Sequence, residues 1–185
     1  MTQLPQIILA SKSPRRHQLL KQLNVDFQVF VPDVTELTQA TAKETVISNA
    51  KLKAEAAALS FPNAIVIAAD TVVAHETRIL EKPEDMNAAM QMLSSLSGQK
   101  HEVHTAIAII HNNELFEYNE TSEVTFKKLN KEIIEAYFTK CNPLDKAGAY
   151  NIDESGEMII ENISGDYENI MGLPTHKIAS FLKNV

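Results

Sequence analysis

A carboxylate directly follows the most apolar run of the chain. Residues 64–69 read Ala-Ile-Val-Ile-Ala-Ala, and Asp70 and Thr71 come next. A run that is apolar throughout predicts a strand covered on both faces, and the carboxyl end of such a strand is the usual ligand-binding edge of an α/β sheet. Because Asp is disfavoured within strands, Asp70 is a candidate catalytic carboxylate. The alternative is a turn residue that ends the strand.

A second candidate site lies near the N-terminus, where the apolar residues 6–10 are followed by Ser-Lys-Ser-Pro-Arg-Arg at residues 11–16. Ser13 is a favourable N-cap, and Pro14 suits a first helical turn. The pattern predicts a strand that turns into a helix, whose N-terminal amides and cationic neighbours attract phosphate. The alternative is a solvated basic helix start. The candidate phosphate ligands here are Ser11, Lys12, Ser13, Arg15 and Arg16.

Two further cationic positions and one acidic position could complete such a site. Lys82 stands just before a predicted helix, and Lys51 and Lys53 lie on another, where spacing alone does not tell which one reaches a cleft. Glu36, in a predicted loop, could supply a second hard oxygen ligand beside Asp70, a pair that suits Mg²⁺. For Glu36 and Lys82, an ordinary solvated surface position is the alternative.

The elements that must position these residues alternate along the chain, which predicts an α/β fold. Apolar runs and period-two patterns predict strands at residues 6–10, 26–30, 64–69, 103–110, 114–126 and 158–163. Helical spacing predicts helices at residues 14–23, 41–60, 83–97, 130–138 and 172–185. Thr41 and Glu44 form a predicted capping box at the start of the second helix. In the last helix, Val185 is among the residues expected to face inward.

Length, composition and charge narrow the class of protein. A chain of 185 residues fits one domain, or one elongated domain with two lobes. Its net charge of -7 argues against a nucleic-acid binder. The single Cys141 excludes an intramolecular disulfide and fits a reducing compartment. No apolar run of about 18 residues occurs, so no membrane span is predicted, and a cytoplasmic protein is expected.

Other common site chemistries find little support in the sequence. His101 and His104 are three residues apart in a predicted strand, so they point to opposite faces and make a poor zinc pair. Neither a Walker-type loop nor a Rossmann-type glycine turn is present, and the chain has only five glycines. The sequence therefore predicts that any phosphate binding by this chain uses neither of these standard nucleotide-binding loops.

Several short segments in a fixed order carry a family resemblance. They are residues 9–16, 69–73, 81–83, 96–105, 145–150 and 165–174. Together they resemble the Maf family of nucleoside triphosphate pyrophosphatases, and the match covers nearly the whole chain. The resemblance implies a single domain over residues 1–185 with an elongated, two-lobed fold similar to that of inosine triphosphate pyrophosphatases. It also implies a twisted mixed β-sheet flanked by helices and an active site in a central cleft.

The resemblance further implies hydrolysis of a nucleoside triphosphate to its monophosphate and pyrophosphate with a divalent metal, Mg²⁺ or Mn²⁺. Asp70 matches the family's catalytic carboxylate. Arg15, Thr71 and Asp153 match its substrate-discriminating positions, and Arg15 with Thr71 resembles the branch that acts on dTTP and UTP. This branch implies a house-cleaning role linked to cell-division arrest. The alternative is a nucleotide-binding regulator of septum formation with little catalysis.

We hypothesise attack of water on the α-phosphorus, with pyrophosphate as the leaving group. Cationic and hydroxyl groups would hold the phosphates, because phosphoryl chemistry depends largely on positioning and electrostatics. These groups are Ser11, Lys12, Ser13, Arg15, Arg16, Lys53 and Lys82. Glu36 and Asp70 would hold the metal or orient the water, and the sequence does not decide whether Asp70 is a general base or a metal ligand.

Asp153 departs from the Gln that the dTTP/UTP branch usually carries. A Gln amide both donates and accepts hydrogen bonds, whereas an ionised Asp only accepts them. A mispaired buried polar contact costs about 1–3 kcal/mol, so we expect a broader preference that includes CTP or modified pyrimidine nucleotides. Beyond the nucleotide, the expected partner is a second copy of the chain, since the family often forms dimers. No nucleic-acid or membrane partner is expected.

Overall fold

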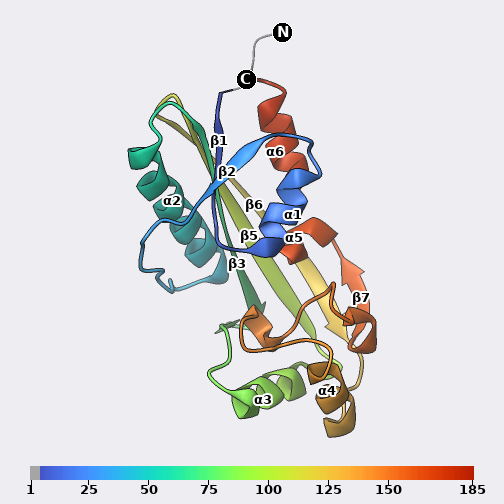
Figure 1. The fold of residues 1–185 in the computed structure, drawn as a ribbon. Helices are drawn as coiled ribbons and strands as arrows, with labels where there is room; N and C mark the ends of the chain where they lie inside the picture. Colours follow the sequence, from blue (N-terminus) through green and yellow to red (C-terminus); the bar gives the residue numbers. More distant parts are fainter. Residues whose placement is uncertain (1–4) are drawn as a thin grey trace. The chain divides into compact units, whose positions relative to one another are not determined.

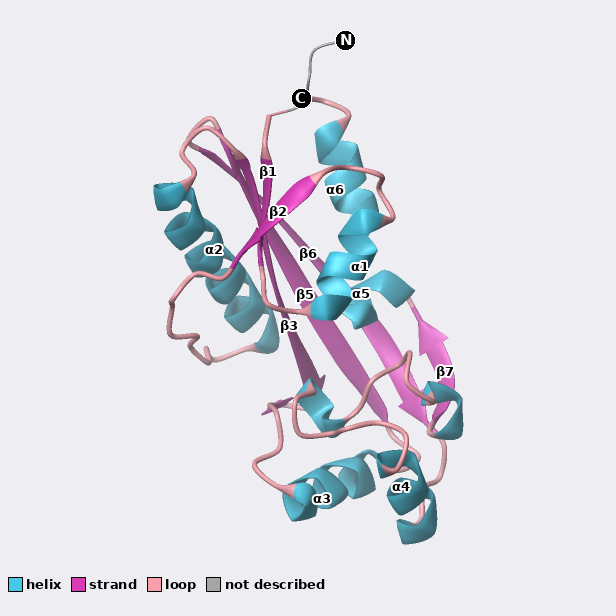
Figure 2. Cartoon of the chain, in the orientation of Figure 1, coloured by secondary structure: helices cyan, strands magenta, loops and turns pink. Residues whose placement is uncertain are grey.

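The computed structural model describes residues 5–185 and confirms the predicted α/β class (Figures 1 and 2). The strands are β1 (Ile7–Ala10), β2 (Phe27–Phe30), β3 (Ile65–His75), β4 (Arg78–Leu80), β5 (Lys100–His111), β6 (Glu114–Phe126) and β7 (Ile160–Ser164). The helices are α1 (Pro14–Lys21), α2 (Ala42–Ser60), α3 (Met86–Leu96), α4 (Lys131–Phe138), α5 (Tyr167–Met171) and α6 (Thr175–Leu182). Two short 3-10 turns, η1 (Ala147–Ala149) and η2 (Gly156–Met158), lie between α4 and β7.

The strands form one seven-stranded mixed sheet, which confirms the predicted sheet type. Its order is β2-β1-β3-β5-β6-β7, and β4 pairs with β3 off this path. β1 is parallel to both β2 and β3, whereas β4 is antiparallel to β3 and β7 is antiparallel to β6. The long strands twist visibly along their length in Figure 1.

The chain divides into two compact units. The first contains the chain up to Asp70, residues 105–120 and residues 172–185, and the second contains residues 71–104 and 121–171. The division falls inside β3, between Asp70 and Thr71, and also inside β5 and β6. The single domain over residues 1–185 stays a prediction.

In the first unit, helices cover both faces of the parallel strands. The connections from β1 to β2 and from β2 to β3 move in opposite directions across the sheet, so right-handed crossovers place α1 and α2 on opposite faces. Figure 2 shows this arrangement, with α6 on the same side as α1. All of β1 is buried, and α2 buries an Ala-rich face against the sheet. The predicted capping box of Thr41 and Glu44 is present at the start of α2.

The second unit has its own apolar core beneath α3 and α4. Val73 of β3, Leu93 of α3 and Phe126 of β6 belong to this core, together with Tyr150 from the loop that follows η1. Gly148 in η1 has φ of +72°, and a Cβ there would lie 3.1 Å from the Val73 side chain. Both the backbone conformation and the close approach to β3 therefore favour glycine at this position.

The structure corrects several predicted boundaries. β3 does not end at Ala69 but runs on to His75, because its last residues pair with β4 in a hairpin that the sequence analysis did not predict. α3 begins at Met86 rather than at Pro83, since the Asp85 side chain caps it. β5 begins at Lys100 rather than 103, and α5 was not predicted. Val185 follows the end of α6 and is exposed rather than facing inward.

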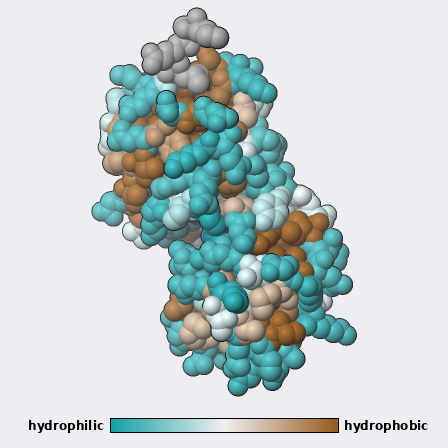
Figure 3. Space-filling view, turned by 45° about the vertical axis from the view of Figure 1, so that its right-hand side comes forward, coloured by the Kyte–Doolittle hydropathy of each residue, from teal (hydrophilic) through white to brown (hydrophobic). Residues whose placement is uncertain are grey.

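Figure 3 shows a mostly hydrophilic face on which apolar areas are separated by hydrophilic ones. Within residues 5–185, none of the helices combines the length and the apolar character that crossing a bilayer requires.

Candidate active site

Asp70 lies just beyond the carboxyl end of β1. In the register of the parallel pair, Leu9 of β1 lies opposite Ile67 of β3, and β1 ends one residue later at Ala10. β3 continues through Asp70, whose side chain is buried. The prediction of a carboxylate at the end of β3 is therefore wrong in its detail. Asp70 instead lies beside the carboxyl end of the neighbouring strand β1. The carboxyl ends of parallel strands are where an α/β sheet commonly binds its ligand.

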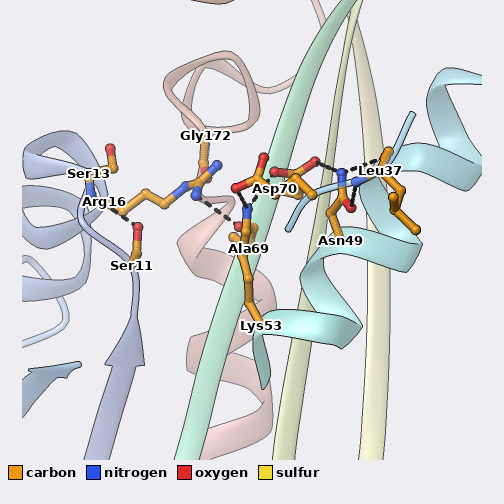
Figure 4. Close-up of polar contacts among 10 residues, drawn as sticks. Ser11, Ser13, Arg16, Leu37, Asn49, Lys53, Ala69, Asp70 and Gly172 are labelled. Carbon is orange, nitrogen blue, oxygen red and sulfur yellow. Dashed lines mark hydrogen bonds and ion pairs between the residues drawn. The ribbon is translucent and has the colours of Figure 1, made fainter. Parts of the chain in front are cut away.

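Lys53 of α2 brings the two predicted metal-binding carboxylates together. Its Nζ lies 2.7 Å from Asp70 Oδ1 and 2.8 Å from Glu36 Oε1, and Lys53 is only 8% exposed. Figure 4 shows the Lys53 side chain rising from α2 to the Asp70 carboxylate. Of the two lysines that the sequence left open, Lys53 is the buried one, whereas Lys51 is exposed and lies 3.9 Å from Glu55.

Asn49, one turn before Lys53, contacts both the loop that carries Glu36 and the Asp70 carboxylate. Its Nδ2 donates to the Leu37 carbonyl (3.0 Å) and to Asp70 Oδ2 (3.3 Å). Its Oδ1 accepts from the Leu37 backbone N–H (2.9 Å). These bonds, drawn in Figure 4, leave both oxygens of Asp70 with a donor from α2.

Thr45, a further turn back, also holds this loop to α2. Its hydroxyl accepts from the Gln39 backbone N–H (2.9 Å) and donates to the Thr41 carbonyl (2.9 Å). Thr45, Asn49 and Lys53 are spaced by four residues, so they share one face of the helix. All three are buried. One stripe of α2 thus organises the loop and the carboxylate.

The predicted turn from β1 into α1 is present, but its serine does not act as predicted. Ser13 occupies the N-cap position and Pro14 is the first helical residue, yet the Ser13 side chain makes no capping hydrogen bond. The Ser13 backbone N–H instead donates to Ser11 Oγ (3.2 Å). Lys12 is exposed and Arg15 is partly buried.

Arg16 connects this corner to the Asp70 strand. Its Nε donates to the Gly172 carbonyl and its Nη1 to the Ala69 carbonyl, both at 2.8 Å. Burial lowers the pKa of the Arg16 guanidinium, and the negative charge of the nearby Asp70 raises it in opposition. Arg16 therefore fixes α1 beside Asp70 through main-chain carbonyls, and its predicted contact with phosphate stays a prediction.

The remaining predicted site residues belong to the second unit. Thr71 follows Asp70 in β3, so the two side chains point to opposite faces of the strand. Lys82 is exposed. Asp153 is also exposed, and its Oδ1 accepts a hydrogen bond from the Tyr167 hydroxyl (2.6 Å). Burial, followed by the contact with Asp153, raises the pKa of Tyr167 to about 12.

Comparison with known proteins identifies the family. The family model described as Maf-like protein matches residues 6–185. The chain belongs to the Maf family. Its relatives include a dTTP/UTP pyrophosphatase of Bacillus cereus strain G9842, 42% identical over 97% of this chain and 95% of that protein. A dTTP/UTP pyrophosphatase of Thermosipho melanesiensis is also 42% identical, over 95% of this chain and 96% of that protein.

Solved structures of more distant proteins share the fold of this Maf chain. The Ham1 protein of Staphylococcus aureus superimposes with a TM-score of 0.58 at 15% identity, over 97% of this chain and 98% of that one. A HAM1 protein from Coxiella burnetii gives 0.56 at 13% identity, over 98% and 100%. At such identities the likeness concerns the fold alone.

His101 and His104 of the Maf chain contact different groups. His101 is 2% exposed, and its Nε2 lies 2.9 Å from the Tyr150 hydroxyl. Burial, with a smaller contribution from the positive charge of His75, lowers the pKa of His101 to about 4. His104 instead contacts Glu102 and Thr121. His101 and His104 thus have no partner in common among these contacts, in line with the predicted opposite faces.

Asn49, which bonds to Asp70, was not predicted as part of the site, and Thr45 was not predicted as a contact of the neighbouring loop. A signal for them exists in the sequence of this Maf chain. Thr45, Asn49 and Lys53 are polar residues at a four-residue spacing, inside a helix whose neighbouring positions Val46, Ala50 and Ala54 are small or apolar. A buried polar stripe of this kind requires polar partners on the element it faces.

Proposed function

We propose that this chain is a dTTP/UTP pyrophosphatase, which hydrolyses these nucleotides to the monophosphate and pyrophosphate. The observation that carries the proposal is the similarity to curated proteins of that name over almost the whole chain, at 42% identity. The site around Asp70 supports it chemically. Carboxylates and cationic groups are concentrated at a sheet edge and a helix start, which are both suited to phosphate chemistry.

The carboxylates are also suited to the expected divalent metal. Asp70 and Glu36 each place an oxygen within 3 Å of the same ammonium, so they converge on one cationic position. Hard carboxylate oxygens are the ligands that Mg²⁺ takes, usually one or two together with water and substrate phosphates. The Asp70 carboxylate can accept more contacts than those from Lys53 and Asn49, because its two oxygens offer about four acceptor positions. A bound Mg²⁺ or Mn²⁺ would supply charge neutralisation for the phosphates.

The chain's own residues would do the positioning. Asp70, held by Lys53 and Asn49, presents a fixed acceptor for the attacking water or a fixed ligand for the metal. Lys12 and Lys82 are exposed and therefore suited to bind the negative charge of an incoming polyphosphate. Ser11, Ser13, Arg15 and Arg16 would contribute further donors at the start of α1.

Asp153 and Tyr167 support a preference that extends beyond uracil and thymine. The carboxylate of Asp153 can accept the N3–H of those bases or the amino group of cytosine, and Tyr167 fixes that carboxylate by donating its hydroxyl hydrogen to Oδ1. We propose that CTP, or a modified pyrimidine nucleotide, is a secondary substrate. A reducing cytoplasmic location, a homodimer and a house-cleaning role linked to cell division stay predictions.

Release of pyrophosphate from a panel of triphosphates tests the proposal. With Mg²⁺ or Mn²⁺, we expect dTTP and UTP to be cleaved fastest, CTP more slowly, and purine triphosphates least. Cleavage of purine triphosphates alone would contradict the base preference. Nucleotide binding by calorimetry without pyrophosphate release would favour the regulator of septum formation instead.

A further inference from the structure

The Asn49 amide has an unambiguous orientation and a dual role in the contacts it makes. The Leu37 backbone N–H requires an acceptor, so the atom facing it is Oδ1. The Leu37 carbonyl and Asp70 Oδ2 require donors, so the atom facing both is Nδ2. One planar group therefore binds a peptide of the loop on one side and the carboxylate of β3 on the other.

Asn49 binds the main chain of Leu37, the residue that follows Glu36. Residues 31–39 form no helix or strand, and Glu36 and Leu37 are exposed although Asn49 itself is 3% exposed. An exposed loop of this kind has few packing contacts that could fix it, so its polar contacts decide where the Glu36 carboxylate lies. Both hydrogen bonds of the Leu37 main chain described above are made with Asn49, which lies on the same helix as Lys53.

We propose that Asn49 is a positioning residue that fixes the Glu36 and Asp70 carboxylates relative to each other. The inference rests on the proposed function, because it concerns the carboxylates of the same site. Lys53 attracts both carboxylates, but the charge of a flexible ammonium imposes little direction. The Asn49 amide adds direction, since its hydrogen bonds fix the loop next to Glu36 and orient the Asp70 plane.

Thr45 provides the matched control. It lies one turn earlier on the same helix face, is equally buried, and binds the same loop through the Gln39 N–H. None of its hydrogen bonds described above reaches Asp70, and Gln39 is three residues from Glu36. Thr45→Val removes a loop contact at nearly constant volume, and Asn49→Leu removes the contacts with the loop and with Asp70 by a side chain of the same branching but larger volume. The two variants thus separate general loop stability from positioning of the carboxylates.

The experiment compares kcat and KM for pyrophosphate release from dTTP in both variants, with unfolding midpoints measured in urea. We expect Asn49→Leu to lower kcat about tenfold to hundredfold, because a small misplacement of catalytic groups has effects of that size. KM should change by less than about threefold, since the exposed phosphate ligands are untouched. Thr45→Val should keep kcat within about threefold of the parent, even if its stability falls as much.

Two further measurements make the result independent of stability and of catalysis. In a double-mutant cycle with Glu36→Gln, the loss caused by Asn49→Leu should shrink, because the carboxylate that Asn49 positions is already gone. Hydrogen exchange should accelerate at the Leu37 amide in Asn49→Leu and at the Gln39 amide in Thr45→Val. Asn49→Asp, which keeps the acceptor for Leu37 but opposes Asp70 with a second carboxylate, should impair kcat at least as much and serves if Asn49→Leu does not fold.

The outcomes distinguish this inference from the proposed function. An active parent whose kcat is unchanged in the Asn49 variants, equally reduced in Thr45→Val, or reduced independently of Glu36 would overturn the positioning role. A parent that releases no pyrophosphate from any triphosphate would contradict the proposed function, and the inference with it.

Discussion

Two lysines, one in each unit of the molecule, present their charge in opposite ways. In the first unit, Lys53 is buried and bonded to two carboxylates, and in the second unit Lys82 is exposed. Both were predicted as phosphate ligands, Lys82 because it stands just before a helix and Lys53 because one lysine of its helix could reach a cleft. The difference shows that a sequence motif identifies a cation without revealing whether its charge is already committed within the protein.

This contrast distinguishes a structural role for Lys53 from a ligand-binding role for Lys82. Lys53 neutralises the charge of Asp70 and Glu36 and so holds the fold of the site together, because a buried carboxylate without a partner is costly. Lys82 has no such task in the described structure and can respond to a ligand. The following changes test the division between groups that are committed within the protein, such as Lys53, and exposed groups, such as Lys82.

Asp70→Asn should have the largest effect. The amide keeps the shape of the carboxylate but loses its charge, so kcat should fall about 100- to 10,000-fold, the range for loss of a catalytic acid or base. Nucleotide affinity measured by calorimetry should be largely retained. Near-normal turnover would show that Asp70 is not a catalytic residue.

The paired variants Lys53→Met and Lys82→Met should separate the two lysines directly. Lys53→Met leaves two carboxylates without their shared cation, and breaking a buried pair costs about 3 kcal/mol of unfolding free energy. Lys82→Met should stay within about 0.5 kcal/mol of the parent, as surface substitutions usually do, and should instead raise KM. Urea denaturation and steady-state kinetics give the two readouts, and equal stability losses would end the distinction.

Acid should weaken the second unit through His101. Its folded pKa of about 4 lies below the ordinary 6.5, so the unfolded chain takes up the proton first. Stability from this residue is complete above pH 6.5 and is lost as the pH falls towards 4. Between pH 7 and 5 the loss is about 2 kcal/mol.

His101→Phe provides the comparison for this effect. This variant lacks the contact with Tyr150 at every pH. Between pH 7 and 5, however, its unfolding free energy should fall by about 2 kcal/mol less than that of the parent. Parallel pH profiles of the parent and the variant would show that His101 is not the group responsible.

The smallest effect is expected at Asp153 in the second unit. Asp153→Gln restores an amide that can both donate and accept, so the ratio of kcat/KM for UTP over CTP should rise about tenfold, the lower part of the range for one mispaired contact. Tyr167→Phe should change this ratio less, because it removes only the partner of Asp153. An unchanged ratio in both variants would place base recognition elsewhere.

Local signals predicted much of the fold from the sequence. The Thr41 capping box and the end of α2 at Ser60 were predicted correctly, because both depend on residues close in sequence. β6 was predicted with its exact ends, Glu114 and Phe126, as a strand with a polar face. The continuation of β3 to His75 could not be seen, because it depends on pairing with β4 rather than on the residues of β3 alone.

The candidate site shows the same limit. Asp70, Glu36 and Lys53 were each selected from the sequence, and the structure brings these three together. Their mutual arrangement was not foreseen, since Lys53 was expected at phosphate rather than between carboxylates. Asn49 was overlooked because two of its three contacts are with the main chain of Leu37. Any residue type offers the same main-chain groups, so the sequence does not show which residue such an amide will bind.

The uncapped start of α1 has a consequence for the balance between stability and activity. The helices α2, α3 and α4 each begin with a side-chain cap, from Thr41, Asp85 and Asn130, whereas Ser13 gives α1 none. A serine cap is usually worth about 1 kcal/mol, so α1 forgoes part of its own stability. Under the proposed function, the triphosphate takes the place of the absent cap. Substrate binding should then add to the stability of the first turn of α1, which Arg16 alone anchors through its side chain in the contacts described above.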